Sequence, residues 1–312
     1  MSDQRETRRG ILYALGAFTT WGVAAPVHFK LLATVPAPQI LAQRIVWGCA
    51  FALALILMLR QGRALTLALV PGRRLALLAL SASLVAMNWL LYIWAINAGH
   101  IVQTSLGYFI NPLVTVLLGI LFLGERLTSL QTAACALACL GVLVMTLAAG
   151  VLPWIAVTLA VSFGFYGLIR KTVRIEPVLG FCIETLVLLP LALGYLLFLT
   201  AAGGSAFLAG DPFIDLLLAL TGVTTAAPLI WFAAAAQRLR LSTLGLLQYL
   251  APTLLLGLGI LVYGEAFTGA HALAFAAIWL GLALYSYDAL RPARPARSAP
   301  AARPVPGAEP RR

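Results

Sequence analysis

Long apolar stretches, separated by short polar connectors, fill most of this chain. Cutting the sequence at its charges and at its Pro/Gly clusters leaves about ten of these stretches. They run roughly over residues 9–30, 38–59, 75–98, 101–123, 129–148, 151–170, 178–199, 213–236, 242–263 and 270–289. About 20 apolar residues form a helix long enough to cross a hydrocarbon core of about 30 Å. The pattern therefore predicts an all-α membrane protein with about ten transmembrane helices.

One proline-containing apolar stretch occurs twice. Residues 105–128 read SLGYFINPLVTVLLGILFLGERLT, and residues 243–268 read TLGLLQYLAPTLLLGLGILVYGEAFT. Pro112 aligns with Pro252, and both stretches continue to a Gly-Glu pair, all at one constant offset of 140 residues. The chain is therefore predicted to contain two copies of one five-helix unit.

The duplication divides the chain into four segments. These are a cytoplasmic N-terminus (1–8), a first five-helix repeat (9–148), a second five-helix repeat (151–289) and a basic Pro/Ala/Arg tail (290–312). The tail has no apolar period and is predicted to be disordered. Because each repeat has an odd number of helices, the two repeats must cross the membrane in opposite directions. Inverted repeats are typical of secondary transporters; a duplicated membrane scaffold that moves no solute is the alternative.

Composition and charge agree with a membrane protein. The chain is 62% hydrophobic and 10% charged, whereas a soluble domain keeps about a quarter of its residues charged. The net charge of +11 comes from residues in connectors and in the tail, which is typical of loops that face anionic lipid rather than of nucleic-acid binding. With the N-terminus in the cytoplasm, cytoplasmic segments hold 19 of the 21 lysines and arginines. We therefore expect both termini to be cytoplasmic.

The two aligned prolines lie near the middle of the fourth and ninth predicted helices. A proline inside a helix has no N–H to donate and clashes with the carbonyl four residues earlier. Pro112 and Pro252 therefore free the carbonyls of Tyr108 and Gln248, which is costly in hydrocarbon. Two breaks near the membrane midplane indicate a substrate site, and a packing kink satisfied by a neighbouring helix is an equal alternative.

Polar and aromatic side chains accompany these breaks. Tyr108 and Asn111 share one face of the fourth helix, and Gln248 and Tyr249 lie at the corresponding turn of the ninth. Helix–helix hydrogen bonds are the structural alternative for such side chains. Four further candidates lie inside other predicted spans: Trp21, Asn88, Tyr92 and Tyr166.

Arg44 and Glu184 are the charges predicted to lie well inside spans, and they too are 140 residues apart. Buried ionisable groups are expensive in a membrane and are functional candidates by default. The predicted topology places their depths roughly 12 Å apart in a core of roughly 30 Å, so we expect each to face a cavity or a different polar partner. Glu184 is also a candidate carrier of a coupling proton.

The Gly-Glu pairs receive a structural interpretation. Glu125 and Glu265 each follow a glycine at the predicted end of a helix, where glycine suits a left-handed cap. Each glutamate is expected to stay solvated or to pair with a neighbour such as Arg126. These pairs are therefore expected to mark where a helix ends.

The chain shows no phosphate-cradling glycine loop, no metal-ligand spacing and no nucleophile–base pair, so neither an enzyme nor a cofactor is predicted. The four cysteines lie inside apolar runs, where they are expected to act as small core residues.

Several segments of the sequence resemble one transporter family. The two inverted halves, with NPL…LGE closing the fourth helix and APT…YGE the ninth, resemble the drug/metabolite transporter superfamily and its EamA-type permeases. The following segments are similar to the RarD-like branch: WGVAAPVHFKLL (21–32), NWLLYIWAIN (88–97), SLGYFINPLV (105–114), FGFYGLIRK (163–171), IETLVLLP (183–190) and LRLSTLGLLQYLAPTL (239–254). The resemblance covers about residues 8–290.

The resemblance implies a multi-pass permease of the bacterial cytoplasmic (inner) membrane. RarD-like proteins are named for a link to chloramphenicol sensitivity, and the resemblance brings no particular substrate and no agreed binding residues. We expect a secondary carrier that moves a small metabolite or drug-like solute, outward, by alternating access. The expected partners are this solute, with a coupling proton as one option, the lipid bilayer and no nucleic acid; a homodimer is left open. A regulator of drug sensitivity that does not transport, and a lipid flippase, are the alternatives.

Overall fold

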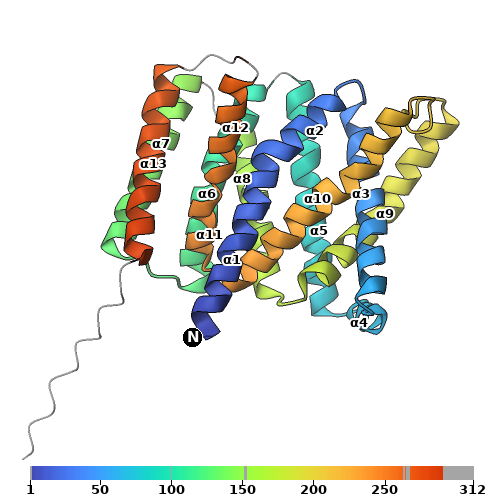
Figure 1. The fold of residues 1–312 in the computed structure, drawn as a ribbon, viewed down its shortest axis with the longest axis horizontal. Helices are drawn as coiled ribbons and strands as arrows, with labels where there is room; N and C mark the ends of the chain where they lie inside the picture. Colours follow the sequence, from blue (N-terminus) through green and yellow to red (C-terminus); the bar gives the residue numbers. More distant parts are fainter. Residues whose placement is uncertain (1, 99, 151–152, 263, 265–267, 291–312) are drawn as a thin grey trace, which may run out of the picture.

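The computed structural model describes residues 2–98, 100–150, 153–262, 264 and 268–290, and this part of the chain forms a bundle of helices without a β-strand (Figure 1). The first half contains α1 (Ser2–Thr19), the π-helical turn η1 (Thr20–Ala24), α2 (Ala25–Leu31), α3 (Ala37–Met58), α4 (Gly62–Ala68), α5 (Arg73–Asn97), α6 (Ile101–Leu123) and α7 (Ser129–Ala149). The second half contains α8 (Trp154–Thr172), α9 (Pro177–Ala201), α10 (Pro212–Arg238), α11 (Leu241–Leu247), α12 (Leu250–Leu261) and α13 (Gly269–Leu290). The predicted all-helical class is confirmed.

Nine helical stretches in the described residues are long and apolar enough to cross a membrane. They correspond to nine of the ten predicted spans. The remaining one, α8, carries Arg170 and Lys171 in its last turn and falls outside this group. It packs against α5, α6 and α10, while Trp154, Val157 and Val161 leave one apolar face exposed.

The two halves run in opposite directions. In Figure 1, α1 rises from the lower edge of the bundle, whereas α8 begins near the upper edge and descends. Helices of one half pack against helices of the other, in pairs that the repeat relates. The α1–α10 contact corresponds to the α8–α5 contact. Three further pairs join corresponding helices of the two halves: α3 with α9, α6 with α11 and α7 with α13. Helices of the two halves therefore alternate through one bundle. The residue boundaries of the repeats and the sidedness of the termini stay predictions.

Local chemistry explains where several helices end. Gly124 adopts a left-handed backbone, with φ of 63°, directly after α6, as expected for a glycine cap. Thr128 and Gln131 form a reciprocal capping box at the start of α7, and the Asp211 carboxylate accepts from two backbone N–H groups at the start of α10. Gly264 has φ of 69°, while Glu265 and the tail 291–312 lie outside the described residues.

The prediction of two proline breaks is half wrong. Helix α6 continues through Pro112, because one missing N–H removes only a single hydrogen bond. The Tyr249 hydroxyl donates to the nearby Phe109 carbonyl at 3.1 Å. The ninth predicted span is interrupted, between α11 and α12 at Gln248. There the carbonyl freed by the proline accepts from Ala251 N at 3.1 Å, in a tighter turn.

A second irregularity, the π turn η1, was not predicted. Pro26 has no N–H for the carbonyl of Gly22, and the wider turn is closed instead by Ala25 N donating to Thr20 O. Gly22 packs so closely on α12 that a Cβ there would lie 2.8 Å from Ala251 O. The π turn of the first span therefore touches the start of α12, directly after the interruption of the ninth.

Candidate functional site

The side chain of Arg44 lies at the centre of a polar and aromatic cluster. Arg44 is seven residues into α3, about 10 Å from its start at 1.5 Å per residue. Its Nε donates to Thr225 Oγ1 at 2.8 Å. The guanidinium carbon lies 4.3 Å from the ring centroid of Trp89 and 5.0 Å from that of Phe29, close enough for cation–π attraction.

Two tyrosines complete this cluster. The rings of Tyr92 and Tyr108 meet edge to face, with centroids 6.1 Å apart, and both hydroxyl groups lie in electrostatic range of Arg44. Tyr108 remains 37% exposed. We call Arg44, Phe29, Trp89, Tyr92, Tyr108 and Thr225 the Arg44 cluster. It joins α2, α3, α5 and α6 of the first half to α10 of the second, so it lies between the halves.

A second charged cluster surrounds Glu184, seven residues into α9. One carboxylate oxygen, Oε1, accepts from Ser81 Oγ at 2.5 Å and lies 3.6 Å from Nη1 of Arg170. The Arg170 side chain is 0% exposed and that of Glu184 is 3% exposed. We call Glu184, Arg170, Ser81 and Tyr166 the Glu184 cluster; Tyr166 is buried and in electrostatic range of the carboxylate.

Arg170, the last residue of the predicted span 151–170, is not among the site candidates that the sequence indicates. The structure places it inside α8, where its side chain is completely buried. Besides the ion pair, its Nη2 donates to the Pro177 carbonyl at 3.1 Å. A glycine creates the space for this side chain, since a Cβ at Gly180 would lie 1.9 Å from Arg170 Nη1. The signal that could have found it is the polar stripe of Ser162, Tyr166 and Arg170 on one helix face.

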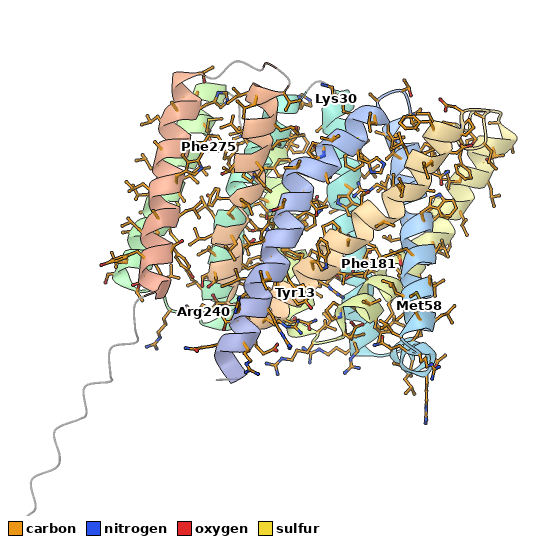
Figure 2. All side chains as sticks on the ribbon, in the orientation of Figure 1. Tyr13, Lys30, Met58, Phe181, Arg240 and Phe275 are labelled. Carbon is orange, nitrogen blue, oxygen red and sulfur yellow. The ribbon has the colours of Figure 1, made fainter. Side chains whose placement is uncertain are left out.

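Arg44 and Glu184 do not pair with each other, as expected. In Figure 1, α3 begins at the upper edge of the bundle and α9 begins at the lower edge. Each residue is seven positions into its own helix, so the two clusters lie toward opposite ends. Figure 2 labels one basic residue near each edge of the bundle: Lys30 lies near the upper edge and Arg240 near the lower edge.

The other predicted site residues lie in three further places. Trp21 joins an aromatic group, with ring centroids 5.7 Å from Phe163 and 5.8 Å from Phe232; Phe232 also stacks on Tyr166. Asn88 on α5 donates to Leu159 O on α8 at 2.7 Å. This is a helix–helix hydrogen bond, the structural role given above as the alternative to substrate binding.

At the proline turns, two buried amide oxygens have no partner among the described residues. They belong to Asn111 and Gln248. Tyr249 is fully buried, and its hydroxyl bonds the Phe109 carbonyl. Buried polar atoms without a partner are rare, so Asn111 and Gln248 stay candidates, while Tyr249 serves the packing of α6.

The Gly-Glu pair has a structural role in the first half. The carboxylate of Glu125 accepts from Leu241 N at 2.6 Å and from Ser242 N at 2.9 Å, and thereby satisfies the first N–H groups of α11. Its ion-pair partner is Arg240, at 3.8 Å, and not Arg126, the neighbour given above as an example. The pair therefore holds the end of α6 to the start of α11.

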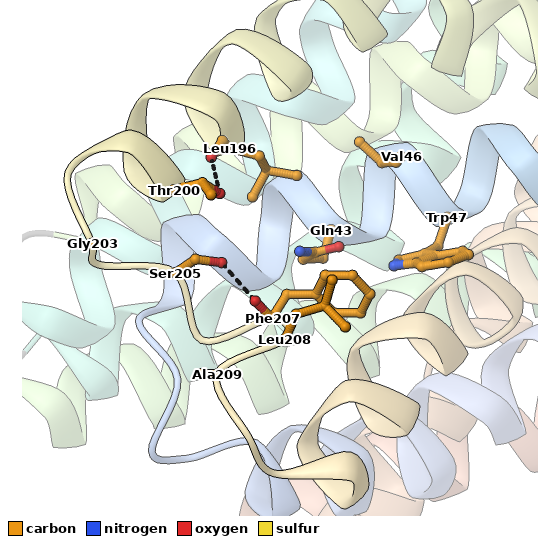
Figure 3. Close-up of a pocket in the computed structure, with 10 residues that line it drawn as sticks. All are labelled: Gln43, Val46, Trp47, Leu196, Thr200, Gly203, Ser205, Phe207, Leu208 and Ala209. Carbon is orange, nitrogen blue, oxygen red and sulfur yellow. Dashed lines mark hydrogen bonds between the residues drawn. The ribbon is translucent and has the colours of Figure 1, made fainter.

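A cavity of about 500 Å³ opens near the upper end of α3, on a side that does not include Arg44. Figure 3 shows Gln43 and Trp47 on α3 opposite Phe207 in the connector after α9. The Trp47 Nε1 atom is buried without an acceptor among the described residues. No metal-binding group of three His, Cys, Asp or Glu occurs in the part of the chain that the structure describes.

Comparison with known proteins relates this geometry to a family. Residues 8–147 match the model of the EamA-like transporter family. A protein named RarD from Salmonella typhi is 47% identical over 92% of this chain and 98% of its own length. The chain belongs to the EamA-like transporters, in the RarD family. An uncharacterized transporter from Vibrio cholerae is 46% identical, over 95% of this chain and 98% of its own.

A solved structure extends the likeness to the fold. It matches this chain with a TM-score of 0.69 at 22% identity, over 90% of this chain and 97% of the other. The matched family segment is 8–147, and the predicted first repeat, 9–148, stays a prediction. The chain is thus a multi-pass membrane protein of a transporter family, and both charged clusters lie within the length that it shares with RarD.

Proposed function

We propose that this protein is a secondary carrier of the bacterial inner membrane, which moves a small metabolite or drug-like solute, outward, by alternating access. Both termini face the cytoplasm in this proposal. The two five-helix repeats are the moving halves, and the solute site lies between them. Membership of a transporter family and the opposite directions of the two halves support this mechanism.

One observation carries the proposal: the two charged clusters at opposite ends differ in how their charges are balanced. The Glu184 cluster is sealed, with Arg170 at 0% exposure and paired with Glu184, whereas no carboxylate among the described residues lies within ion-pair distance of Arg44. Alternating access requires one end of the path to be open while the other is closed. In this proposal the path is closed at the Glu184 end, and the ion pair between Glu184 and Arg170 is one of the contacts that close it.

The solute would first meet the Arg44 cluster. Asn111 and Gln248, whose amide oxygens lack partners, would supply polar contacts deeper in the bundle. Trp21 and Tyr166 would border the path through their shared aromatic neighbour Phe232. The π turn at Trp21 and the interruption at Gln248 are the flexible points, since such irregular turns frequently occur at functional sites.

Efflux from proteoliposomes tests the proposal. The vesicles are loaded with a bacterial metabolite extract, and mass spectrometry follows each solute that leaves faster than from protein-free vesicles. We expect at least one such solute, and slower efflux with Arg44→Ala and Glu184→Gln combined. Lys30→Ala, which removes an exposed charge on α2, is the matched control and should transport normally.

Two results would contradict the proposal. Unchanged efflux in the double variant would remove the assigned roles of both residues. If no solute left faster than from protein-free vesicles, the chain would be a scaffold or a regulator of drug sensitivity rather than a carrier.

A further inference from the structure

We propose that the Arg44 cluster binds the carboxylate of a small organic anion. This inference rests on the proposed carrier function and adds the charge class of its solute. It starts from the free part of the Arg44 guanidinium, which the neighbouring helices leave without an acceptor.

The guanidinium is only partly engaged by the protein. Nε donates to Thr225, whereas Nη1 and Nη2 donate to no acceptor among the described residues. Neither atom is one of the buried polar atoms that lack a partner, so both open onto accessible space. A guanidinium fork with its two terminal nitrogens free matches the two oxygens of a carboxylate.

The charge of Arg44 is also uncompensated. Among the described residues, no carboxylate lies within ion-pair distance of it, whereas Arg170 has Glu184. The neighbouring His28 ring is engaged elsewhere, with Leu217 O at 2.9 Å and Thr224 Oγ1 at 3.1 Å. A cation about 10 Å inside a span is costly without a counter-charge. An anionic solute would supply that charge each time it binds.

The rest of the cluster suits the remainder of such a solute. The Trp89 and Phe29 rings, 4.3 and 5.0 Å from the guanidinium carbon, offer apolar surface beside the charge. The hydroxyls of Tyr92 and Tyr108 lie within hydrogen-bonding reach of each other, so one of the two can donate a further hydrogen bond to an anion. The geometry favours a carboxylate head on a compact apolar or aromatic body.

Thermal stability in lipid nanodiscs tests this inference, because a ligand that binds the folded state raises Tm. Benzoate and phenylacetate are compared with their amides, benzamide and phenylacetamide, in discs of zwitterionic phosphatidylcholine. We expect the acids to raise Tm in a concentration-dependent way and the amides to have no effect. Arg44→Gln should weaken the affinity at least about tenfold, as the loss of a charged hydrogen bond implies.

Matched variants make the result specific. Lys30→Gln changes the net charge equally, on an exposed side chain of α2, and should respond to the acids as the original protein does. Arg44→Lys keeps the charge but loses the fork, so it should bind the acids with intermediate affinity.

Three outcomes would overturn the inference. The first is equal stabilisation by the amides, the second is an unchanged response of Arg44→Gln, and the third is the absence of any response to the acids. None of them contradicts the carrier proposal, which depends on protein-dependent efflux of any solute.

A lipid headgroup is the other source of an anion. Discs containing phosphatidylglycerol separate the two sources. If anionic lipid raised the Tm of the original protein but not that of Arg44→Gln, while the acids added nothing, the cluster would hold a lipid and the solute assignment would be wrong.

Discussion

The Arg44 and Glu184 clusters occupy equivalent positions in the two halves, yet their charges are balanced differently. Glu184 has an arginine at 3.6 Å and a serine hydroxyl at 2.5 Å, and nothing in that cluster is open. Arg44 has aromatic rings and one threonine, and its terminal nitrogens have no acceptor among the described residues. The comparison separates a charge that holds helices together from a charge that is available to a solute.

Removing the Glu184 carboxylate should have the largest effect on stability. Glu184→Ala leaves Arg170 buried and unpaired, and breaking a buried pair from one side costs about 3–5 kcal/mol. Denaturant unfolding in detergent micelles measures the loss. The double variant with Arg170→Met should recover part of it, because the stranded charge is then absent. A single variant as stable as the original protein would show that the pair holds nothing.

Deleting one hydroxyl in each cluster compares the clusters directly. Ser81→Ala removes a donor to a sealed carboxylate, and hydrogen bonds to charged groups contribute about 1.5–3 kcal/mol. Thr225→Val removes an acceptor from Arg44, whose remaining nitrogens reach accessible space, so we expect a loss of about 0.5–1 kcal/mol. Denaturant unfolding in detergent micelles measures both losses of unfolding free energy. Equal losses would remove the distinction between the clusters.

Two glycines of α9 test the space that Arg170 occupies. A Cβ at Gly180 meets Arg170 Nη1, whereas a Cβ at Gly194 meets nothing within 4 Å. Gly180→Ala should therefore cost about 1–3 kcal/mol through overpacking. Gly194→Ala should be neutral or stabilise by up to about 1 kcal/mol, since alanine is the better helix former. Identical stabilities would mean that the arginine has room to move aside.

Neutralising Arg44 should have the smallest effect on stability. Arg44→Gln loses cation–π contacts worth about 0.5–2 kcal/mol, but it also relieves an uncompensated charge inside a span. We expect the unfolding free energy to change by about 1 kcal/mol or less while efflux is impaired. A loss comparable with that of Glu184→Ala would make Arg44 a structural residue like its counterpart.

The sequence predicted those features that depend on a few neighbouring residues. Apart from α1, which begins at Ser2 rather than near residue 9, the bounds of the predicted spans agree within a few residues, because apolar length and charged connectors decide them. The cap at Gly124 follows from its own backbone freedom. The separation of Arg44 from Glu184 follows from their positions along oppositely directed helices. In each case the deciding residues lie within a few turns of one another.

The tertiary structure decided what depends on helices that are distant in sequence. Pro112 and Pro252 look equivalent, but α6 stays continuous through Pro112, whereas the ninth span is interrupted at Gln248. Arg170 is the last residue of a predicted span, and its burial depends on α9, which supplies both Glu184 and the space beside Gly180. The identity of one residue does not show which distant side chain packs against it. The sequence thus determined a duplicated, inverted helical membrane protein, and only the packing decided which of its buried charges is neutralised from within.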